Sequence, residues 1–143
     1  MERKIRIVVA DDHQPFRDAL IHLLSLDADI DVVGAAADGR EAYDLCMNLH
    51  PDVVLMDLVM PGVDGATATR YIKQEAPETK VIMFSVFNQE RYIRRGAEAG
   101  VDRYLPKGIS REELLATVKA VAEEAMAAGE TADSGDGRKP VQG

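Results

Sequence analysis

The sequence predicts an α/β fold, a doubly wound parallel sheet of five strands connected by crossover helices. Short runs rich in valine, isoleucine and leucine alternate along it with longer stretches in which apolar residues recur every three or four positions. Buried strands and amphipathic helices produce these two patterns, and their regular alternation is typical of a parallel sheet. The most continuous apolar run, Val53 to Met56, indicates a central strand that is buried on both faces.

Helix-start signals follow the first two apolar runs. After the run Ile5 to Ala10, Pro15 stands where a first helical position is expected, ahead of apolar residues at helical spacing. After the run Ile30 to Ala36, the stretch Asp38 to Glu41 is similar to a capping box, and Pro51 closes the helix that it begins. These segments predict two strand-helix units.

The remaining three strand-helix units differ in how clearly the sequence indicates their helices. The segment after Val53 to Met56 passes through turn signals to a short helical stretch that stops before Pro77. The fourth strand is predicted over Lys80 to Phe84, with a helix over Asn88 to Ala99. The fifth is predicted over Val101 to Leu105, and Ser110-Arg111-Glu112-Glu113 forms a capping box ahead of the last helix.

The length, charge and cysteine content limit the class of protein. The 143 residues suit one domain, expected over residues 1–127, with residues 128–143 expected as a disordered tail or linker because they have almost nothing to bury. The formal net charge of −8 works against binding to nucleic acid or to an anionic membrane. The sequence has one cysteine, Cys46, and it shows neither the apolar stretch of a secretion signal nor an apolar run of membrane-spanning length. A cytoplasmic location is therefore expected.

Polar residues follow four of the predicted strands. Asp11 and Asp12 come after the first strand, Asp57 after the third, Ser85 after the fourth and Lys107 after the fifth. Since parallel strands place their carboxyl ends at one edge of the sheet, these side chains are expected to converge there. Singly, each has a plainer interpretation, such as a helix cap for Asp12 or a turn for Ser85, but jointly they indicate a site.

Clustered carboxylates call for a cation. Two unit charges about 4 Å apart repel by about 4 kcal/mol at an effective dielectric of about 20. The donors are all oxygen, which favours Mg²⁺ over Zn²⁺. A carboxylate beside Mg²⁺ and Lys107 is suited to attack phosphorus, with Ser85 bonding a phosphoryl oxygen, and the product is an aspartyl phosphate.

Over residues 4 to 127 the chain resembles the receiver domain of bacterial two-component response regulators. The resemblance rests on Asp11-Asp12, on the segment Val53 to Gly65 around Asp57, on Ser85 and on Tyr104-Leu105-Pro106-Lys107. It implies a flavodoxin-like (βα)5 fold with strand order 2-1-3-4-5. It also implies a phosphorylatable signalling switch rather than an enzyme, with chemistry limited to its own phosphotransfer and autodephosphorylation.

The resemblance assigns roles to individual residues. It implies that Asp57 accepts a phosphoryl group from the phosphohistidine of a sensor histidine kinase. It implies that Asp11, Asp12 and Asp57 hold Mg²⁺ together with the backbone carbonyl of Val59. It further implies that Ser85 and Tyr104 are a switch pair, in which the hydroxyl moves to the phosphate and the ring turns inward, which changes the partner-binding surface.

The motifs are also similar to those of regulators that carry a C-terminal helix-turn-helix of the nitrate-regulator type. No such domain is evident after Ala127, so the output partner stays open: a separate protein, or a DNA-binding domain of a larger regulator. Direct binding of nucleic acid or membrane by these residues is not expected. A phosphorylation-dependent homodimer through the fourth helix, fifth strand and fifth helix also stays open.

Two other functions share part of this set of residues. A phosphohydrolase of the haloacid-dehalogenase type needs an aspartate two residues after its nucleophile. Here that position is occupied by Val59, which disfavours this function. A pseudo-receiver, a phosphate-independent interaction module, usually lacks an acidic residue or the lysine, and both are present. His13 is expected to be exposed rather than a metal ligand, and Cys46 to be buried and inert.

Overall fold

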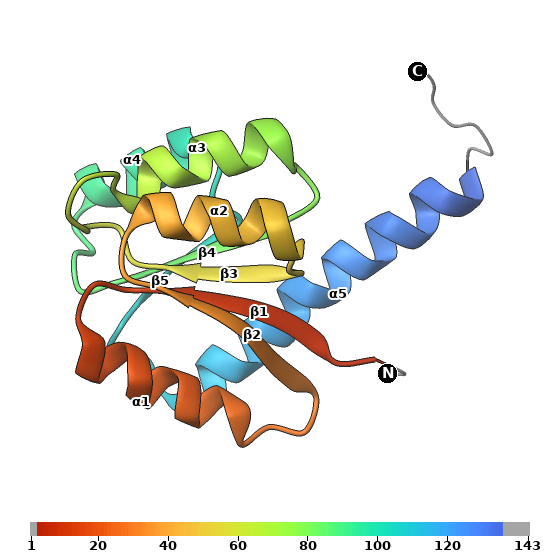
Figure 1. The fold of residues 1–143 in the computed structure, drawn as a ribbon, viewed down its shortest axis with the longest axis horizontal. Helices are drawn as coiled ribbons and strands as arrows, with labels where there is room; N and C mark the ends of the chain where they lie inside the picture. The colour runs from red at the N-terminus through yellow and green to blue at the C-terminus, as the bar shows by residue number, and fades with distance from the viewer. Residues whose placement is uncertain (1–2, 136–143) are drawn as a thin grey trace.

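The computed structural model describes residues 3–135 and contains five parallel strands in the order β2-β1-β3-β4-β5, alternating along the chain with five helices (Figure 1). The strands are β1 (Ile5–Ala10), β2 (Ile30–Ala36), β3 (Val53–Met56), β4 (Lys80–Ser85) and β5 (Arg103–Pro106). The helices are α1 (Gln14–Ser25), α2 (Gly39–Leu49), α3 (Gly65–Glu75), α4 (Glu90–Ala99) and α5 (Arg111–Gly135). The predicted fold class and strand order are confirmed.

Each face of the sheet is covered by helices. Along β1, Ile7 and Val9 point into a core shared with α1 and α5, whereas Val8 and Ala10 point into a core shared with α2 and α3. Figure 1 shows α1 and α5 on one side of the sheet and α2, α3 and α4 on the other. β3, in the middle, is fully buried, as its continuous apolar sequence predicts.

Side-chain caps fix the start of two predicted helices. The carboxylate of Asp38 accepts a hydrogen bond from the N–H of Glu41 at 2.9 Å, at the start of α2. The hydroxyl of Ser110 accepts one from the N–H of Glu113 at 3.1 Å, at the start of α5. Both satisfy backbone donors that a first helical turn leaves free, so the two sequence patterns act as predicted.

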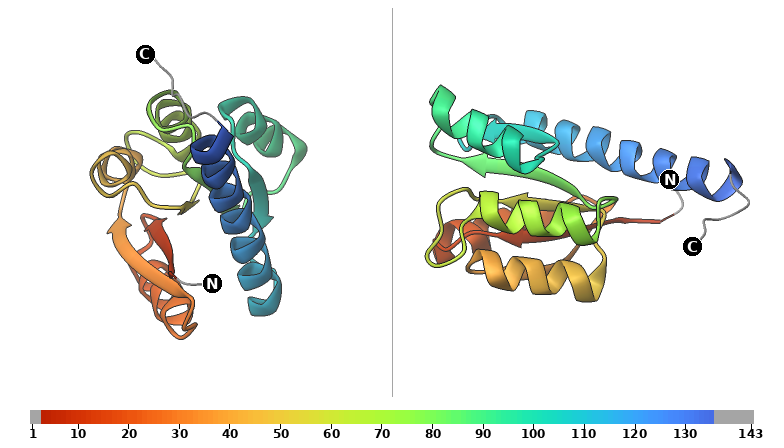
Figure 2. Two further views of the ribbon diagram at one scale, coloured as in Figure 1. Left: turned by 90° about the vertical axis from the view of Figure 1, so that its right-hand side faces the viewer. Right: turned by 90° about the horizontal axis from the view of Figure 1, so that it is seen from above.

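Some boundaries differ from the predicted ones. β5 begins at Arg103 rather than Val101, and α4 begins at Glu90 rather than Asn88. The larger difference is at the end of α5, which continues to Gly135 instead of stopping at residue 127. Residues 123–128 are mainly alanine and glutamate, strong helix formers, which favours a helix that extends past the sheet (Figure 2). The rest of the expected tail, 136–143, lies outside the described residues.

Within residues 3–135, every helix is too short or too polar to span a lipid bilayer.

Candidate functional site

The register of the sheet brings Asp11 and Asp57 together. Ala10, the last residue of β1, pairs with Met56, the last residue of β3. Asp11 and Asp57 follow directly, and the Asp57 N–H donates to the Ala10 carbonyl at 2.9 Å. The two carboxylates therefore leave the sheet side by side at its carboxyl edge.

The ends of β4 and β5 bring Ser85 and Lys107 to the same edge. Ser85 pairs with Pro106, and the N–H of Lys107 donates to the Ser85 carbonyl at 3.0 Å. From this position the Lys107 side chain reaches across the edge toward the ends of β1 and β3. All four strand ends thus contribute to one site, as the sequence predicts.

The three aspartates form one oxygen cluster. Asp11, Asp12 and Asp57 each offer a carboxylate oxygen, and these oxygens lie within 4.8 Å of one another. Asp11 and Asp57 are 2% and 8% exposed, while Asp12 is exposed to solvent. Donors of this kind and spacing suit a hard divalent cation, because Mg²⁺ combines one or a few carboxylates with retained water.

Lys107 is the positive charge that faces this cluster. Its Nζ donates to Oδ2 of Asp11 at 2.7 Å and to Oδ2 of Asp57 at 3.0 Å. The other oxygens of these carboxylates accept backbone N–H groups, from His13 for Asp11 and from Leu58 for Asp57. One ammonium therefore serves two buried carboxylates, and the site keeps a negative charge that a cation would offset.

The titration of the site reflects this imbalance. Burial raises the pKa of Asp57 above its ordinary value, the neighbouring charge of Asp11 adds to the increase, and the hydrogen bond from Lys107 only partly offsets it. Burial alone would lower the pKa of Lys107, but the bonds and charges of both aspartates outweigh it and raise that pKa. Lys107 is therefore charged at neutral pH.

Ser85 and Tyr104 meet at one peptide group. The buried Ser85 hydroxyl accepts the Phe87 N–H at 3.0 Å, and the Tyr104 hydroxyl donates to the Phe87 carbonyl. Burial is also the main reason why the pKa of Tyr104 is raised. Both side chains thus hold the segment that leads from β4 into α4, which links the edge of the site to that helix.

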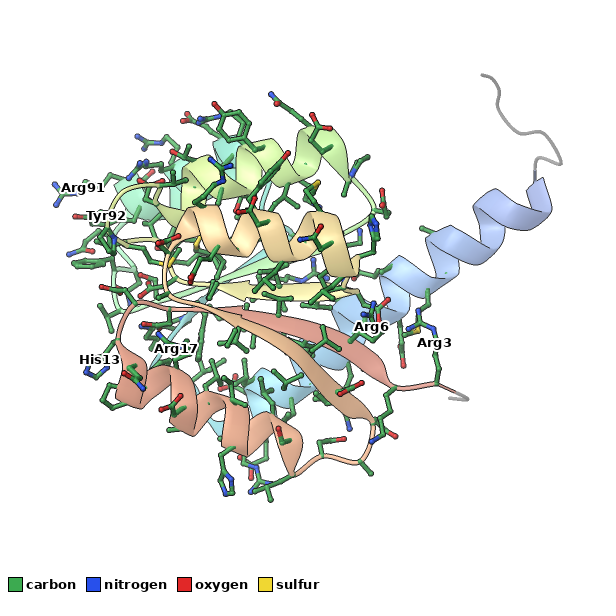
Figure 3. The ribbon with its side chains drawn as sticks, viewed as in Figure 1. Arg3, Arg6, His13, Arg17, Arg91 and Tyr92 are labelled. Carbon is green, nitrogen blue, oxygen red and sulfur yellow. The ribbon has the colours of Figure 1, made fainter. Side chains whose placement is uncertain are left out.

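Two residues near the site lie where the sequence predicts and do not join the cluster. His13 is exposed at the start of α1, and its ring points away from the body of the protein (Figure 3). Val59 lies two residues past Asp57 with its side chain 46% exposed. The role of the Val59 carbonyl as a metal ligand stays a prediction. Cys46, on the inner face of α2, is fully buried in the core, as expected.

Two residues of α1 that the sequence reasoning missed contact the site. The Arg17 guanidinium donates to the Asp11 backbone carbonyl at 2.6 Å (Figure 3). The Phe16 ring lies under the Lys107 ammonium, with 4.4 Å between Nζ and the ring centroid. Both lie in the first turn of α1, only a few residues after Asp11 and Asp12 in the sequence. This closeness in sequence was the one feature that could have indicated their contact with the site.

The sequence model of the response regulator receiver domain family matches residues 7–119. The chain is 38% identical to the transcriptional regulatory protein DegU of Brevibacillus brevis over 122 residues, which are 85% of this chain and 52% of DegU. It is 38% identical to the response regulator protein VraR of Staphylococcus aureus over 115 residues, 80% of this chain and 55% of VraR. The chain thus spans about half the length of the curated relatives it matches.

Solved structures give the same result. The signal receiver domain of a Mycobacterium tuberculosis protein described as the response regulator NarL is 35% identical, with a TM-score of 0.78 over 87% of this chain and 98% of that one. A chain from the CheX-CheY-BeF3-Mg+2 complex of Borrelia burgdorferi is 25% identical, with a TM-score of 0.77 over 83% and 90% of the two chains. The predicted likeness to regulators of the nitrate-regulator type is confirmed.

Proposed function

Because this chain belongs to the response regulator receiver domain family, we propose that it is a phosphorylatable signalling switch whose Asp57 accepts a phosphoryl group from a sensor histidine kinase. The observation that carries this proposal is the convergence of Asp11 and Asp57 on Lys107 Nζ, at 2.7 and 3.0 Å. A nearly buried carboxylate beside a fixed ammonium is suited to accept a phosphoryl group.

In the transfer, the Asp57 carboxylate attacks the phosphorus of a phosphohistidine. A P–O bond forms to Asp57, the P–N bond breaks, and its electron pair returns to the imidazole nitrogen of the donor. Lys107 offsets the negative charge of the incoming phosphoryl group. Hydrolysis of the aspartyl phosphate later restores the carboxylate.

We assign Mg²⁺ as the cofactor, held by Asp11, Asp12, Asp57 and the Val59 carbonyl. When bound, Mg²⁺ supplies positive charge that polarises the phosphoryl oxygens. The all-oxygen cluster supports this assignment, as does the similar Borrelia burgdorferi chain, which belongs to a complex named with BeF3 and Mg.

Ser85 and Tyr104 provide the switch. The Ser85 hydroxyl moves to bond a phosphoryl oxygen, which releases the N–H of Phe87 that it holds in this structure. Tyr104, bonded to the carbonyl of the same residue, then repacks with it. A charge added at Asp57 is in this way converted into a changed surface at the start of α4.

The partners follow from the family and its relatives. A histidine kinase is the phosphodonor, and the output is transcriptional, since DegU is named a transcriptional regulatory protein and is about twice the length matched here. A DNA-binding domain, in the same or a second chain, would respond to the changed surface, with or without homodimerisation. The buried thiol of Cys46 is compatible with the reducing cytoplasm, where we place this reaction.

Intact mass measured after incubation with acetyl phosphate tests the proposal. The parent protein should gain one phosphoryl group when Mg²⁺ is present and none when EDTA replaces it. Asp57→Asn should gain none. Asp44→Asn, which removes an exposed carboxylate of α2, is the matched control and should behave as the parent does.

The same measurement distinguishes a phosphorylatable switch from a phosphate-independent interaction module. A folded parent that takes up no phosphoryl group would identify a phosphate-independent interaction module. Uptake that persists in Asp57→Asn would place the acceptor on another residue and contradict the assignment of Asp57.

A further inference from the structure

The Lys107 side chain is held from two sides. On one side its Nζ bonds the carboxylates of Asp11 and Asp57. On the other it lies 4.4 Å from the centroid of the Phe16 ring, within the range of a cation–π interaction. The lysine side chain is only 13% exposed, and limited access of water strengthens an attraction of this kind.

The Phe16 ring is itself fixed by the fold. Its centroid lies 6.0 Å from that of Phe84, a 5%-exposed residue of β4, and Pro15 sets the start of α1 just before it. Phe16, Phe84 and Lys107 line a groove of about 170 Å³ between α1 and the start of α5. The ring and the ammonium thus share one groove.

Lys107 needs such a support because its other restraints change during phosphorylation. Lysine is a flexible chain carrying a point charge, and it is followed by Gly108, where a Cβ would meet only open space. The carboxylate of Asp57 becomes an acyl phosphate, a mixed anhydride, when the phosphoryl group arrives, so one of the two anions that hold the ammonium is altered. The face of Phe16 stays the same before and after the transfer.

We propose that Phe16 is a positioning residue for phosphorylation, holding the Lys107 ammonium against the site by its aromatic face. The inference rests on the proposed function, the transfer of a phosphoryl group to Asp57. Phe16 touches neither the aspartates nor the phosphoryl group in this role and acts through Lys107. Its ring is what matters, rather than its volume.

The rate of phosphorylation tests this at saturating acetyl phosphate and Mg²⁺. Phe16→Leu and Phe16→Met keep an apolar side chain without the ring and should slow phosphorylation about three- to tenfold. Phe16→Tyr keeps the ring and should restore the parent rate. Leu23→Ala removes apolar volume from the same groove away from the ammonium and should leave the rate unchanged.

A second measurement reports the contact itself. In the NMR spectrum of the parent, the ε-CH2 protons of Lys107, assigned by their absence in Lys107→Arg, should be shifted upfield by the ring current of Phe16. The shift should vanish in Phe16→Leu and Phe16→Met and persist in Phe16→Tyr. A purely structural role of Phe16 would not predict this division. If Phe16→Leu does not fold, Phe16→Met gives the same comparison with nearly conserved volume.

The outcomes distinguish this role from the proposed function. A parent protein that takes up no phosphoryl group would overturn the proposed function, and with it any role of Phe16 in that reaction. A phosphorylated parent that Phe16→Leu and Phe16→Met match in rate would overturn the role of Phe16 alone. Phe16→Tyr as slow as Phe16→Leu would also overturn it, because the ring would then not be the cause.

Discussion

Gly96 of α4 lies directly against the ring of Tyr104: a Cβ at residue 96 would be 3.1 Å from the ring carbon Cδ2. That distance is shorter than ordinary van der Waals contact. The missing side chain at residue 96 therefore makes room for the Tyr104 orientation in which the hydroxyl donates to the Phe87 carbonyl.

Gly96→Ala should give no net stabilisation in the parent protein. Alanine within a helix is worth about 1 kcal/mol relative to glycine, but here its Cβ pushes against Tyr104. In a Tyr104→Ala background the gain of about 1 kcal/mol should appear in full. Urea unfolding of the parent, the two single variants and the double variant measures this difference as a double-mutant cycle. Equal effects of Gly96→Ala in both backgrounds would show that the two residues are not coupled.

Mg²⁺ should stabilise the parent protein and have little effect on Asp57→Asn. A ligand that binds only the folded state adds about 2.7 kcal/mol at 100 times its dissociation constant. Asp57→Asn removes one charge from the cluster of carboxylates. Urea unfolding with increasing Mg²⁺ measures both proteins, with EDTA as the metal-free reference.

In EDTA, Asp57→Asn should be more stable than the parent protein. Burial raises the pKa of Asp57, so the folded protein disfavours the charged carboxylate, and the neutral amide of Asn avoids that cost. Asp57→Asn should then unfold at higher urea than the parent. A lower midpoint for Asp57→Asn in EDTA would mean that its bond with Lys107 outweighs the desolvation.

Arg17→Met should weaken Mg²⁺ binding by up to about tenfold, because partners of metal ligands typically affect affinity by this order. The Arg17 guanidinium donates to the carbonyl of Asp11 and so fixes the turn that carries Asp11 and Asp12. Isothermal titration with Mg²⁺ measures the affinity. Arg40→Met removes the same charge from an exposed position on α2 and serves as the control. If Arg17→Met and Arg40→Met bind Mg²⁺ with the same affinity, the bond from Arg17 to the Asp11 carbonyl makes no contribution and only a long-range effect of the removed charge is left.

The fold and the centre of the site were predictable because both depend on local patterns. Continuous apolar runs such as Val53 to Met56 identify buried parallel strands, and their carboxyl ends determine where Asp57 and Lys107 meet. The end of α5 was not predictable from the burial pattern: residues 123–128 are mainly alanine and glutamate, strong helix formers, and the helix continues to Gly135.

The orientation of side chains around the site was not predictable from the sequence. An apolar residue at helical spacing such as Phe16 is compatible with a place in the core, yet the rotation of α1 places its ring at Lys107. The bond from Tyr104 to the Phe87 carbonyl likewise depends on the space at Gly96, which lies in another element. Such contacts depend on the three-dimensional packing of distant segments.

Asp64 should contribute stability that depends on pH. Its carboxylate caps α3 by accepting the Thr67 N–H at 2.9 Å, and it pairs with Arg95 of α4. Burial alone would raise the pKa of Asp64, but the bonds from Thr67 and the charge of Arg95 outweigh it and hold that pKa below its ordinary value. A lowered pKa in the folded state means that this stability is present above the unfolded value and is lost as the pH falls through the folded one.

Two variants of Asp64 separate the cap from the charge. At pH 7, Asp64→Ala should lose about 1 kcal/mol, the typical value of a helix N-cap, and Asp64→Asn, which still caps, should lose less. The difference between the parent and Asp64→Asn should begin to shrink as the pH falls below about 4, the ordinary pKa of an aspartate, and should disappear once the pH is below the lowered pKa of folded Asp64. Urea unfolding at several pH values measures it. A difference that stays constant to the lowest pH would contradict the contribution of the charge.

Cys46 should be inert in the folded protein. The thiol is fully buried on α2, and burial raises its pKa to about 12. The reactive thiolate is therefore scarce at pH 8, and reagents lack access to it. Reaction with a chromogenic disulfide at pH 8 should be slow in buffer and fast in concentrated urea, where the thiol has its ordinary pKa. Because the chain has a single cysteine, the signal has one source. Fast reaction without urea, from protein with intact secondary structure, would show that α2 opens locally and exposes the thiol.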